Sequence, residues 1–206
     1  MRVRVWAAAA SIAALASMAA CGGGETPAPS GSSPGPAGTS TAAAPTTPAT
    51  SVAAPLTCDM VRGASIGSKT VKFHDYDGIP LLEGRWAGED GNEVELRECA
   101  VGDLDGDGAI DVLAAVSLNA GGTGRFWSLD YWRNVDGEPV YSAHKDLDDR
   151  TPVESITIAA AKATVVWLTR GATDPAIALT IRRTSVFTLS GPTLGETSFT
   201  DAPYTP

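Results

Sequence analysis

The sequence predicts an all-β domain, an antiparallel sandwich or a strongly curved sheet, preceded by a disordered tether. Short segments rich in β-branched and aromatic residues recur along residues 57–206, with Gly, Asp and Pro between them. Asp136-Gly137 is a strong signal for a β-hairpin turn. Residues 58–66 are the one segment in which a short amphipathic helix is the alternative. This combination is typical of antiparallel β folds.

The predicted strands follow one another along the domain. The first covers residues 79–86 and ends before Gly88. Residues 93–100 alternate imperfectly between apolar and polar, whereas residues 110–118 are apolar on both faces, as in a central strand that is covered on both sides. The remaining predicted strands are residues 125–132, 140–144, 155–159, 164–169 and 176–189.

The first twenty residues predict an export signal. Two arginines precede an apolar run that is shorter than a typical transmembrane helix. The run ends in Met18-Ala-Ala before Cys21, which resembles the lipobox of bacterial lipoproteins, although Met stands where Leu is commoner. We interpret residues 1–20 as a lipoprotein signal peptide and Cys21 as the lipidated first residue of the mature chain. Ordinary secretion with an incidental Cys21 is the alternative.

The segment after Cys21 is almost entirely Gly, Ala, Ser, Thr and Pro up to about residue 56. Such a composition lacks the large apolar side chains that offset the entropy of ordering. We therefore expect residues 21–56 to be a disordered tether that holds a domain away from the membrane. Residues 57–206 have the length of one domain with its own core.

The formal net charge of −9 limits the partners of the chain. An acidic protein is repelled by nucleic acid and by anionic lipid surfaces, so neither is expected as a binding partner. A solvated acidic surface is sufficient to explain the charge.

Cys58 and Cys99 are the two cysteines of the domain. In an exported protein, two cysteines pair more often than they stay free. A disulfide between them would close a loop of about 40 residues and would stabilise the fold by roughly 3–4 kcal/mol.

The tract from residue 103 to residue 111 predicts a metal site. It carries four aspartates within nine positions, and these carboxylates repel one another unless a hard cation binds them. Calcium takes about six to eight oxygen ligands. Part of this set is supplied by carboxylates at positions 1, 3, 5 and 9 of such a loop and by the backbone carbonyl at position 7. The predicted calcium ligands are Asp103, Asp105, Asp107, the carbonyl of Ala109, and Asp111.

The tract differs from an EF-hand in two ways. Ala114 occupies position 12, where an EF-hand has a bidentate Glu. The residues beyond Gly108 favour a strand rather than a helix. We therefore expect Asp111 to close a structural calcium site between two strand ends. An Asp-Gly-rich hairpin without metal is the alternative.

Residues 102–116 resemble one unit of the FG-GAP or VCBS type, whose calcium loops usually occur in arrays. One copy is visible here, which disfavours a propeller. The order of later motifs, among them Asn134-Val-Asp-Gly-Glu-Pro-Val and Leu168-Thr-Arg-Gly-Ala-Thr-Asp-Pro, is similar to a family of uncharacterised bacterial envelope lipoproteins. This resemblance covers most of residues 72–194. It implies an all-β exported domain with a single DxDxDGxxD loop and no assigned activity.

The sequence contains no familiar catalytic motif. His74 and His144 are interpreted as surface or hydrogen-bonded residues, and no zinc site is expected once the domain cysteines are bridged. The Asp-rich segments 74–78 and 146–149 could supply the paired acids of a glycosidase, although turns also explain them. Core filling or a sugar-stacking platform are the alternatives for Trp86, Trp127, Trp132 and Trp167.

Together these features favour a lipoprotein anchored on the extracytoplasmic face of the cell membrane, with a structural calcium-binding β domain. It would be a non-enzymatic binding or envelope-maintenance module, whose partner is an envelope protein or a glycan. The alternative is an envelope hydrolase that acts on glycan or ester substrates through paired carboxylates. An inhibitor or adhesin-like role would require Trp127 and Trp132 to form an exposed patch.

Overall fold

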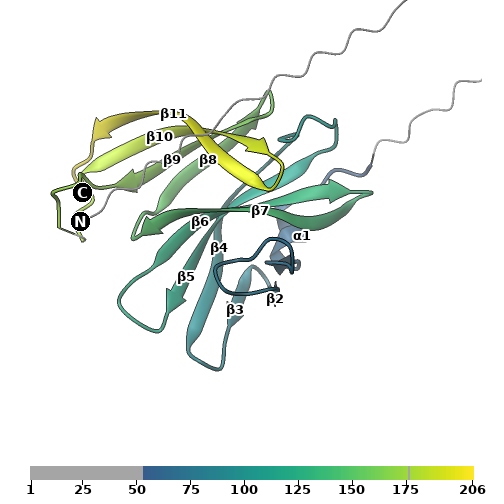
Figure 1. The fold of residues 1–206 in the computed structure, drawn as a ribbon, viewed down its shortest axis with the longest axis horizontal. Helices are drawn as coiled ribbons and strands as arrows, with labels where there is room; N and C mark the ends of the chain where they lie inside the picture. Colours follow the sequence, from purple (N-terminus) through teal and green to yellow (C-terminus); the bar gives the residue numbers. More distant parts are fainter. Residues whose placement is uncertain (1–52, 176) are drawn as a thin grey trace, which may run out of the picture. The chain divides into compact units, whose positions relative to one another are not determined.

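The computed structural model describes residues 53–175 and 177–206 of the chain. These residues form antiparallel sheets with one short helix, which confirms the predicted all-β class (Figure 1). The predicted signal peptide, the lipidation site at Cys21 and the tether up to residue 52 lie outside the described residues. Among the described residues, no helix is long and apolar enough to cross a membrane.

The elements follow in chain order as α1 (Cys58–Arg62), β1 (Ser65–Ile66), β2 (Ile79–Pro80), β3 (Arg85–Ala87), β4 (Asn92–Gly102), β5 (Asp111–Ala120), β6 (Phe126–Val135), β7 (Glu138–Asp149), β8 (Val153–Ala159), β9 (Lys162–Thr169), β10 (Ile181–Ser190) and β11 (Thr193–Pro203). The larger sheet has the order β3-β4-β5-β6-β7 and the smaller one the order β11-β10-β9-β8. β1 and β2 form a separate pair. The fold is therefore built mainly from hairpins between consecutive strands.

The two large sheets pack against each other around one apolar core (Figure 1). Leu113 of β5 and Leu129 of β6 point into it from the five-stranded sheet. Val165 and Trp167 of β9, with Phe187 of β10, meet them from the four-stranded sheet. Because successive residues of a strand face opposite sides, only alternate residues of each strand enter this core. This is the sandwich expected from the sequence.

The other face of the five-stranded sheet is covered by the chain segment that precedes β3. Val112 and Val116 of β5 pack there with Val61 of α1, Phe73 and Ile79. β5 is consequently buried on both faces along most of its length. That burial explains why its sequence is apolar at successive positions rather than at alternate ones.

Helix α1 is attached to this sheet at its N-terminal end. Thr57 caps its N-terminus by accepting a hydrogen bond from the backbone N–H of Met60. A disulfide joins Cys58 at the start of the helix to Cys99 of β4, with a Cα–Cα distance of 6.0 Å. The start of the domain is thereby fixed beside the strand that leads into the Asp-rich loop.

The strand series differs from the sequence prediction in several places, and β10, for example, begins at Ile181 rather than at residue 176. Residues 79–86 do not form one strand, because Glu83 and Gly84 adopt positive φ angles of 53° and 80° and separate β2 from β3. β11 has no predicted counterpart. Most of its residues are exposed, so its sequence lacks the apolar alternation of a strand that faces a core.

Candidate functional site

The predicted calcium tract is the connection between β4 and β5. Gly102 at the end of β4 pairs with Asp111 at the start of β5, so the two ends of the loop lie side by side. Gly106 and Gly108 reverse the chain with φ angles of 80° and 89°, which L side chains rarely adopt. The tract is therefore a tight hairpin connection whose last aspartate begins the central strand.

Three of the four predicted carboxylates converge in this loop. Asp103, Asp105 and Asp111 each offer one oxygen, and these oxygens lie within 4.8 Å of one another. Asp107 lies outside the group, and its Oδ1 accepts a hydrogen bond from the N–H of Ala109 at 2.9 Å. The structure thus brings together the first, third and ninth positions of the loop.

Asp111 anchors the loop to the next strand. Its carboxylate is fully buried, and its Oδ2 accepts hydrogen bonds from Leu104 N at 3.1 Å and Tyr131 Oη at 2.8 Å. Its Oδ1 accepts a third from Asn134 N at 2.9 Å. Burial and the hydrogen bond to Asp111 raise the pKa of Tyr131, so the phenol stays protonated and remains a donor. Asp111 is therefore a rigid part of the loop.

Arg133 of β6 supplies positive charge to the same loop. Its Nε lies 2.8 Å from Asp105 Oδ2, and its Nη2 lies 2.7 Å from Asp107 Oδ2. The hydrogen bond from Arg133 lowers the pKa of Asp107. Burial raises the pKa of Asp105, and the charges of Asp111 and Asp107 add to this shift. The sequence did not indicate this partner, because no spacing rule connects Arg133 to the loop.

The carboxylates of the loop retain acceptor capacity for a cation. A carboxylate offers about four lone-pair positions. Asp103 uses two of them, for the N–H groups of Gly106 and Gly108 at 2.7 and 3.1 Å, and Asp111 uses three. A donor set made only of oxygens suits a hard cation such as Ca²⁺. The residues present thus fit the predicted ion.

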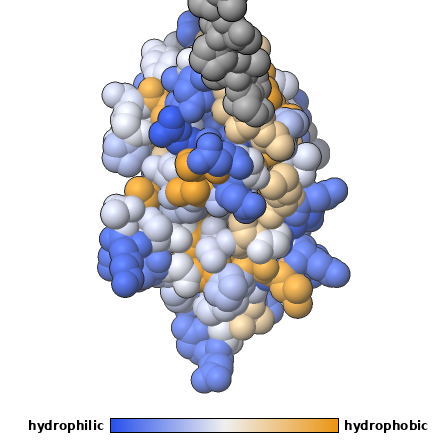
Figure 2. Space-filling model, turned by 90° about the vertical axis from the view of Figure 1, so that its right-hand side faces the viewer, coloured by the Kyte–Doolittle hydropathy of each residue, from blue (hydrophilic) through white to orange (hydrophobic). Residues whose placement is uncertain are grey.

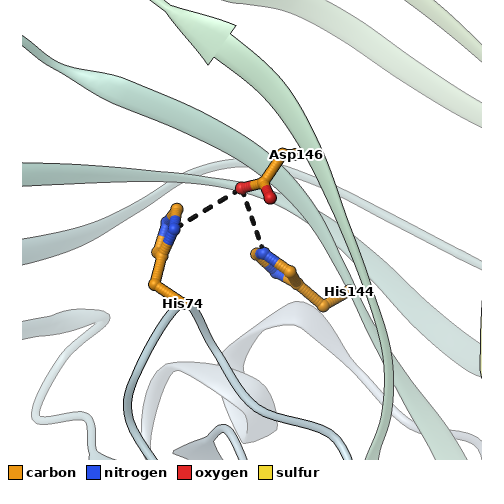
Figure 3. A group of neighbouring side chains, drawn as sticks. All are labelled: His74, His144 and Asp146. Carbon is orange, nitrogen blue, oxygen red and sulfur yellow. Dashed lines mark hydrogen bonds and ion pairs between the residues drawn. The ribbon is translucent and has the colours of Figure 1, made fainter. Parts of the chain in front are cut away.

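A second cluster lies between β7 and the turn that closes on Phe73 and Tyr76. Figure 3 shows Asp146 between the imidazole rings of His74 and His144. Asp146 Oδ1 lies 3.4 Å from His74 Nδ1 and 3.2 Å from His144 Nε2. The two ring centroids are 5.1 Å apart. The fold therefore joins two histidines that look isolated in the sequence.

Asp130 of β6 supports this cluster through a hydrogen bond with His144. It is fully buried, and its Oδ1 accepts hydrogen bonds from Tyr141 Oη at 2.6 Å and from His144 Nδ1 at 2.9 Å. Its Oδ2 accepts one from Ser128 Oγ at 2.7 Å. Burial lowers the pKa of His144, but the hydrogen bond and charge of Asp130, together with the charge of Asp146, outweigh it, so the net shift is upward.

His74 is held in an unusual conformation. Its φ of 49° lies in the left-handed region, which is strained for a residue other than Gly. Its Nε2 is buried and has no hydrogen-bond partner among the described residues. Burial, followed by the proximity of His144, lowers the pKa of His74.

No family model, curated protein or solved structure matches this chain.

The other candidates from the sequence are engaged in different ways. Asp77 forms an exposed ion pair with Lys72 at 3.2 Å, while Asp146 contacts the two histidines. Trp127 and Trp132 are buried, so they fill the core and form no exposed patch. Trp127 and Trp132 therefore do not form the aromatic patch considered from the sequence.

Trp86 is the tryptophan of the domain that is partly exposed. Together with Pro80 and Leu82, it lines a groove of about 400 Å³ that Arg85 and Glu93 flank. On the face drawn in Figure 2, hydrophobic residues form small groups among hydrophilic ones. The groove thus combines an aromatic side chain with charged neighbours.

Proposed function

We propose that this chain is a lipid-anchored extracytoplasmic protein whose β domain binds one calcium ion in the loop between β4 and β5. It serves as a non-enzymatic binding or envelope-maintenance module. The convergence of Asp103, Asp105 and Asp111 within 4.8 Å carries the calcium part of the proposal. Met18-Ala-Ala before Cys21 carries the lipid anchor.

The charges of the loop favour a cation in spite of Arg133. The four aspartates of the tract outnumber the one guanidinium that contacts them, so the loop keeps a net negative charge. Burial raises the pKa of Asp105, and an ion held by the three converging carboxylates would relieve the repulsion from Asp111 and Asp107 that adds to this shift. Because Asp111 is tied to β6, the ion would connect β4, β5 and β6, which is a structural role.

Calcium titration and thermal unfolding of the full chain test this proposal. We expect one ion per chain and a lower midpoint of unfolding in EGTA than in calcium. Asp103→Asn removes one converging charge and should abolish that difference. Asp77→Asn, in an exposed pair with Lys72, is the matched control and should preserve it. An unfolding midpoint of the native chain that EGTA leaves unchanged would remove the calcium proposal.

The anchor is tested by fractionating cells that express the chain. We expect the native chain in the membrane fraction. Cys21→Ser should release it, because lipid attachment requires the thiol. Equal membrane association of both chains would contradict the anchor without affecting the calcium site.

The groove beside Trp86 is the binding surface that we assign to the module. An aromatic ring bordered by charged groups can stack on a sugar ring and hydrogen-bond its hydroxyls. Co-sedimentation with purified cell-wall glycan should retain the native chain and lose Trp86→Ala. Phe199→Ala, at an exposed aromatic residue of β11, is the control and should behave like the native chain. Failure of the native chain to sediment would overturn this surface.

A further inference from the structure

The histidine cluster combines the donor atoms of a transition-metal site. We propose that His74, His144 and Asp146 bind a divalent first-row transition-metal ion, with zinc as the ion that fits them best. Two imidazole nitrogens and one carboxylate oxygen suit zinc, whereas calcium prefers oxygen alone. This site is separate from the calcium loop, and neither proposal rests on the other.

Two of the distances within the cluster match those between neighbouring ligands around an ion. Zinc–ligand bonds of about 2.0–2.1 Å in tetrahedral geometry place neighbouring ligand atoms about 3.3 Å apart. Asp146 Oδ1 lies 3.4 Å from His74 Nδ1 and 3.2 Å from His144 Nε2. A direct charge-assisted hydrogen bond would be shorter, at about 2.7–2.9 Å. Both contacts are therefore close to the separation of neighbouring ligand atoms around a tetrahedral zinc ion.

Asp130 gives His144 the orientation of a metal ligand. Because carboxylate oxygens only accept hydrogen bonds, His144 Nδ1 donates its hydrogen to Asp130 Oδ1 at 2.9 Å. In the neutral ring that binds a metal, the lone pair would then be on Nε2, which here contacts Asp146 Oδ1 at 3.2 Å. A carboxylate behind a ligating histidine is the usual support of zinc sites. The hydroxyl groups of Tyr141 and Ser128 hold that carboxylate in place.

The position of His74 is otherwise unexplained. Its left-handed backbone stores strain of the kind found at functional sites, and its Nδ1 faces Asp146. Phe73 packs edge-on against both imidazoles, at centroid distances of 4.6 and 5.6 Å, and fixes them beside each other. A bond from Nδ1 to a metal ion would offset the strain.

The site is open on one side. The side chain of Asp146 is 68% exposed, whereas those of His74 and His144 are 20% and 12% exposed. Three protein ligands and one solvent-facing position are the arrangement in which zinc holds an exchangeable water or ligand. The cluster is thus suited to bind an external donor through the metal, unlike a closed structural site.

Zinc titration of the full chain, purified without a polyhistidine tag, tests the proposal. We expect one high-affinity zinc per chain. Asp146→Asn and His74→Gln should each weaken the affinity at least about tenfold. Because Asp146 is exposed, its variant should fold, and circular dichroism checks this for both. Cobalt(II) should give the absorption of a tetrahedral site in the native chain and lose it in both variants.

Two control variants separate this site from other ligands in the chain. Asp103→Asn removes a carboxylate of the calcium loop, and Cys21→Ser removes the cysteine sulfur that lies outside the disulfide. Both should keep the native zinc affinity. Zinc binding that survives Asp146→Asn and His74→Gln together, or that is lost in either control, would overturn the proposal. Failure of the native chain to bind calcium, with its zinc binding intact, would refute the calcium proposal alone.

Discussion

The loop after β4 and the histidine cluster on β7 are assembled in opposite ways. The acidic groups of the loop come from one short tract, residues 103–111. The cluster instead joins β7 to a turn that is distant in the sequence. Both nevertheless contain or contact a buried aspartate that accepts a hydrogen bond from a tyrosine hydroxyl. Asp111 accepts from Tyr131 at 2.8 Å, and Asp130 accepts from Tyr141 at 2.6 Å.

The difference lies in what the buried aspartate does. Asp111 is itself one of the converging groups of its loop, so it joins the candidate site directly to β6. Asp130 is not one of the converging groups of its cluster, and it acts on the cluster through its hydrogen bond with His144. A change at the loop should therefore affect both the fold and ion binding, whereas the exposed Asp146 can be changed with little effect on the fold.

The largest expected effect is that of Asp111→Ala. It leaves three donors unpaired in a buried place, so we expect a loss of about 3–5 kcal/mol in the free energy of unfolding. Asp146→Ala should change this free energy by no more than about 0.5 kcal/mol without metal. Urea unfolding in the presence of chelator measures both. Similar losses in the two variants would refute the distinction between the sites.

The two tyrosines offer the next test. Tyr131→Phe and Tyr141→Phe each remove a hydroxyl that donates to a buried carboxylate, and each should lower the stability by about 1.5–3 kcal/mol. Their effects on ions should be opposite. Tyr141→Phe should weaken zinc binding roughly tenfold and leave calcium binding unchanged, and Tyr131→Phe should do the reverse. Equal effects on both ions would show that the clusters are coupled.

Arg133→Gln should strengthen calcium binding. The guanidinium repels a cation in the loop, so its removal should raise the calcium affinity by about fivefold, as expected for one charge at a partly solvated site. Zinc binding should not change. Arg183→Gln on β10 is the matched control, since Arg183 pairs with Asp201 in the other sheet. A lower calcium affinity in Arg133→Gln would mean that Arg133 helps to build the site.

The sequence predicted the features that depend on neighbouring residues. The all-β class, the turn at Asp136-Gly137 and the buried central strand follow from local patterns, and the structure has all three. β11 was not predicted because only one of its residues is buried and most of the others are exposed. Its sequence therefore shows no alternation of apolar and polar residues. Local patterning is thus informative only where burial imposes it.

The same limit applies to the candidate sites. The aspartates of the loop are visible in the sequence because they lie within one tract, although their pairing with Arg133 is not. His74 and His144 meet only because the turn that carries His74 lies against β7, and that packing has no sequence signature. Sites assembled across elements therefore require the fold before they can be recognised.

A small expected effect belongs to Asp201→Asn, which measures an arginine–carboxylate pair outside any acidic loop. Arg183 holds Asp201 with two hydrogen bonds of 2.7 and 2.8 Å and lies over the ring of Phe199. The hydrogen bond from Arg183 lowers the pKa of Asp201. A lowered pKa means that the pair stabilises the fold above the unfolded pKa and that this stability is lost as the pH falls through the folded pKa.

Near neutral pH we therefore expect Asp201→Asn to be less stable than the native chain by about 0.5–1 kcal/mol, because the pair is partly solvated and screened. In strong acid the difference should disappear, since the native carboxyl is then neutral as well. Urea unfolding across this pH range measures it. Calcium should not alter the difference in stability between Asp201→Asn and the native chain. It should alter the corresponding difference for Asp107→Asn, because Arg133, the partner of Asp107, also faces the loop. A calcium-dependent difference at Asp201 would show that the ion acts on the whole sandwich and not on the loop alone.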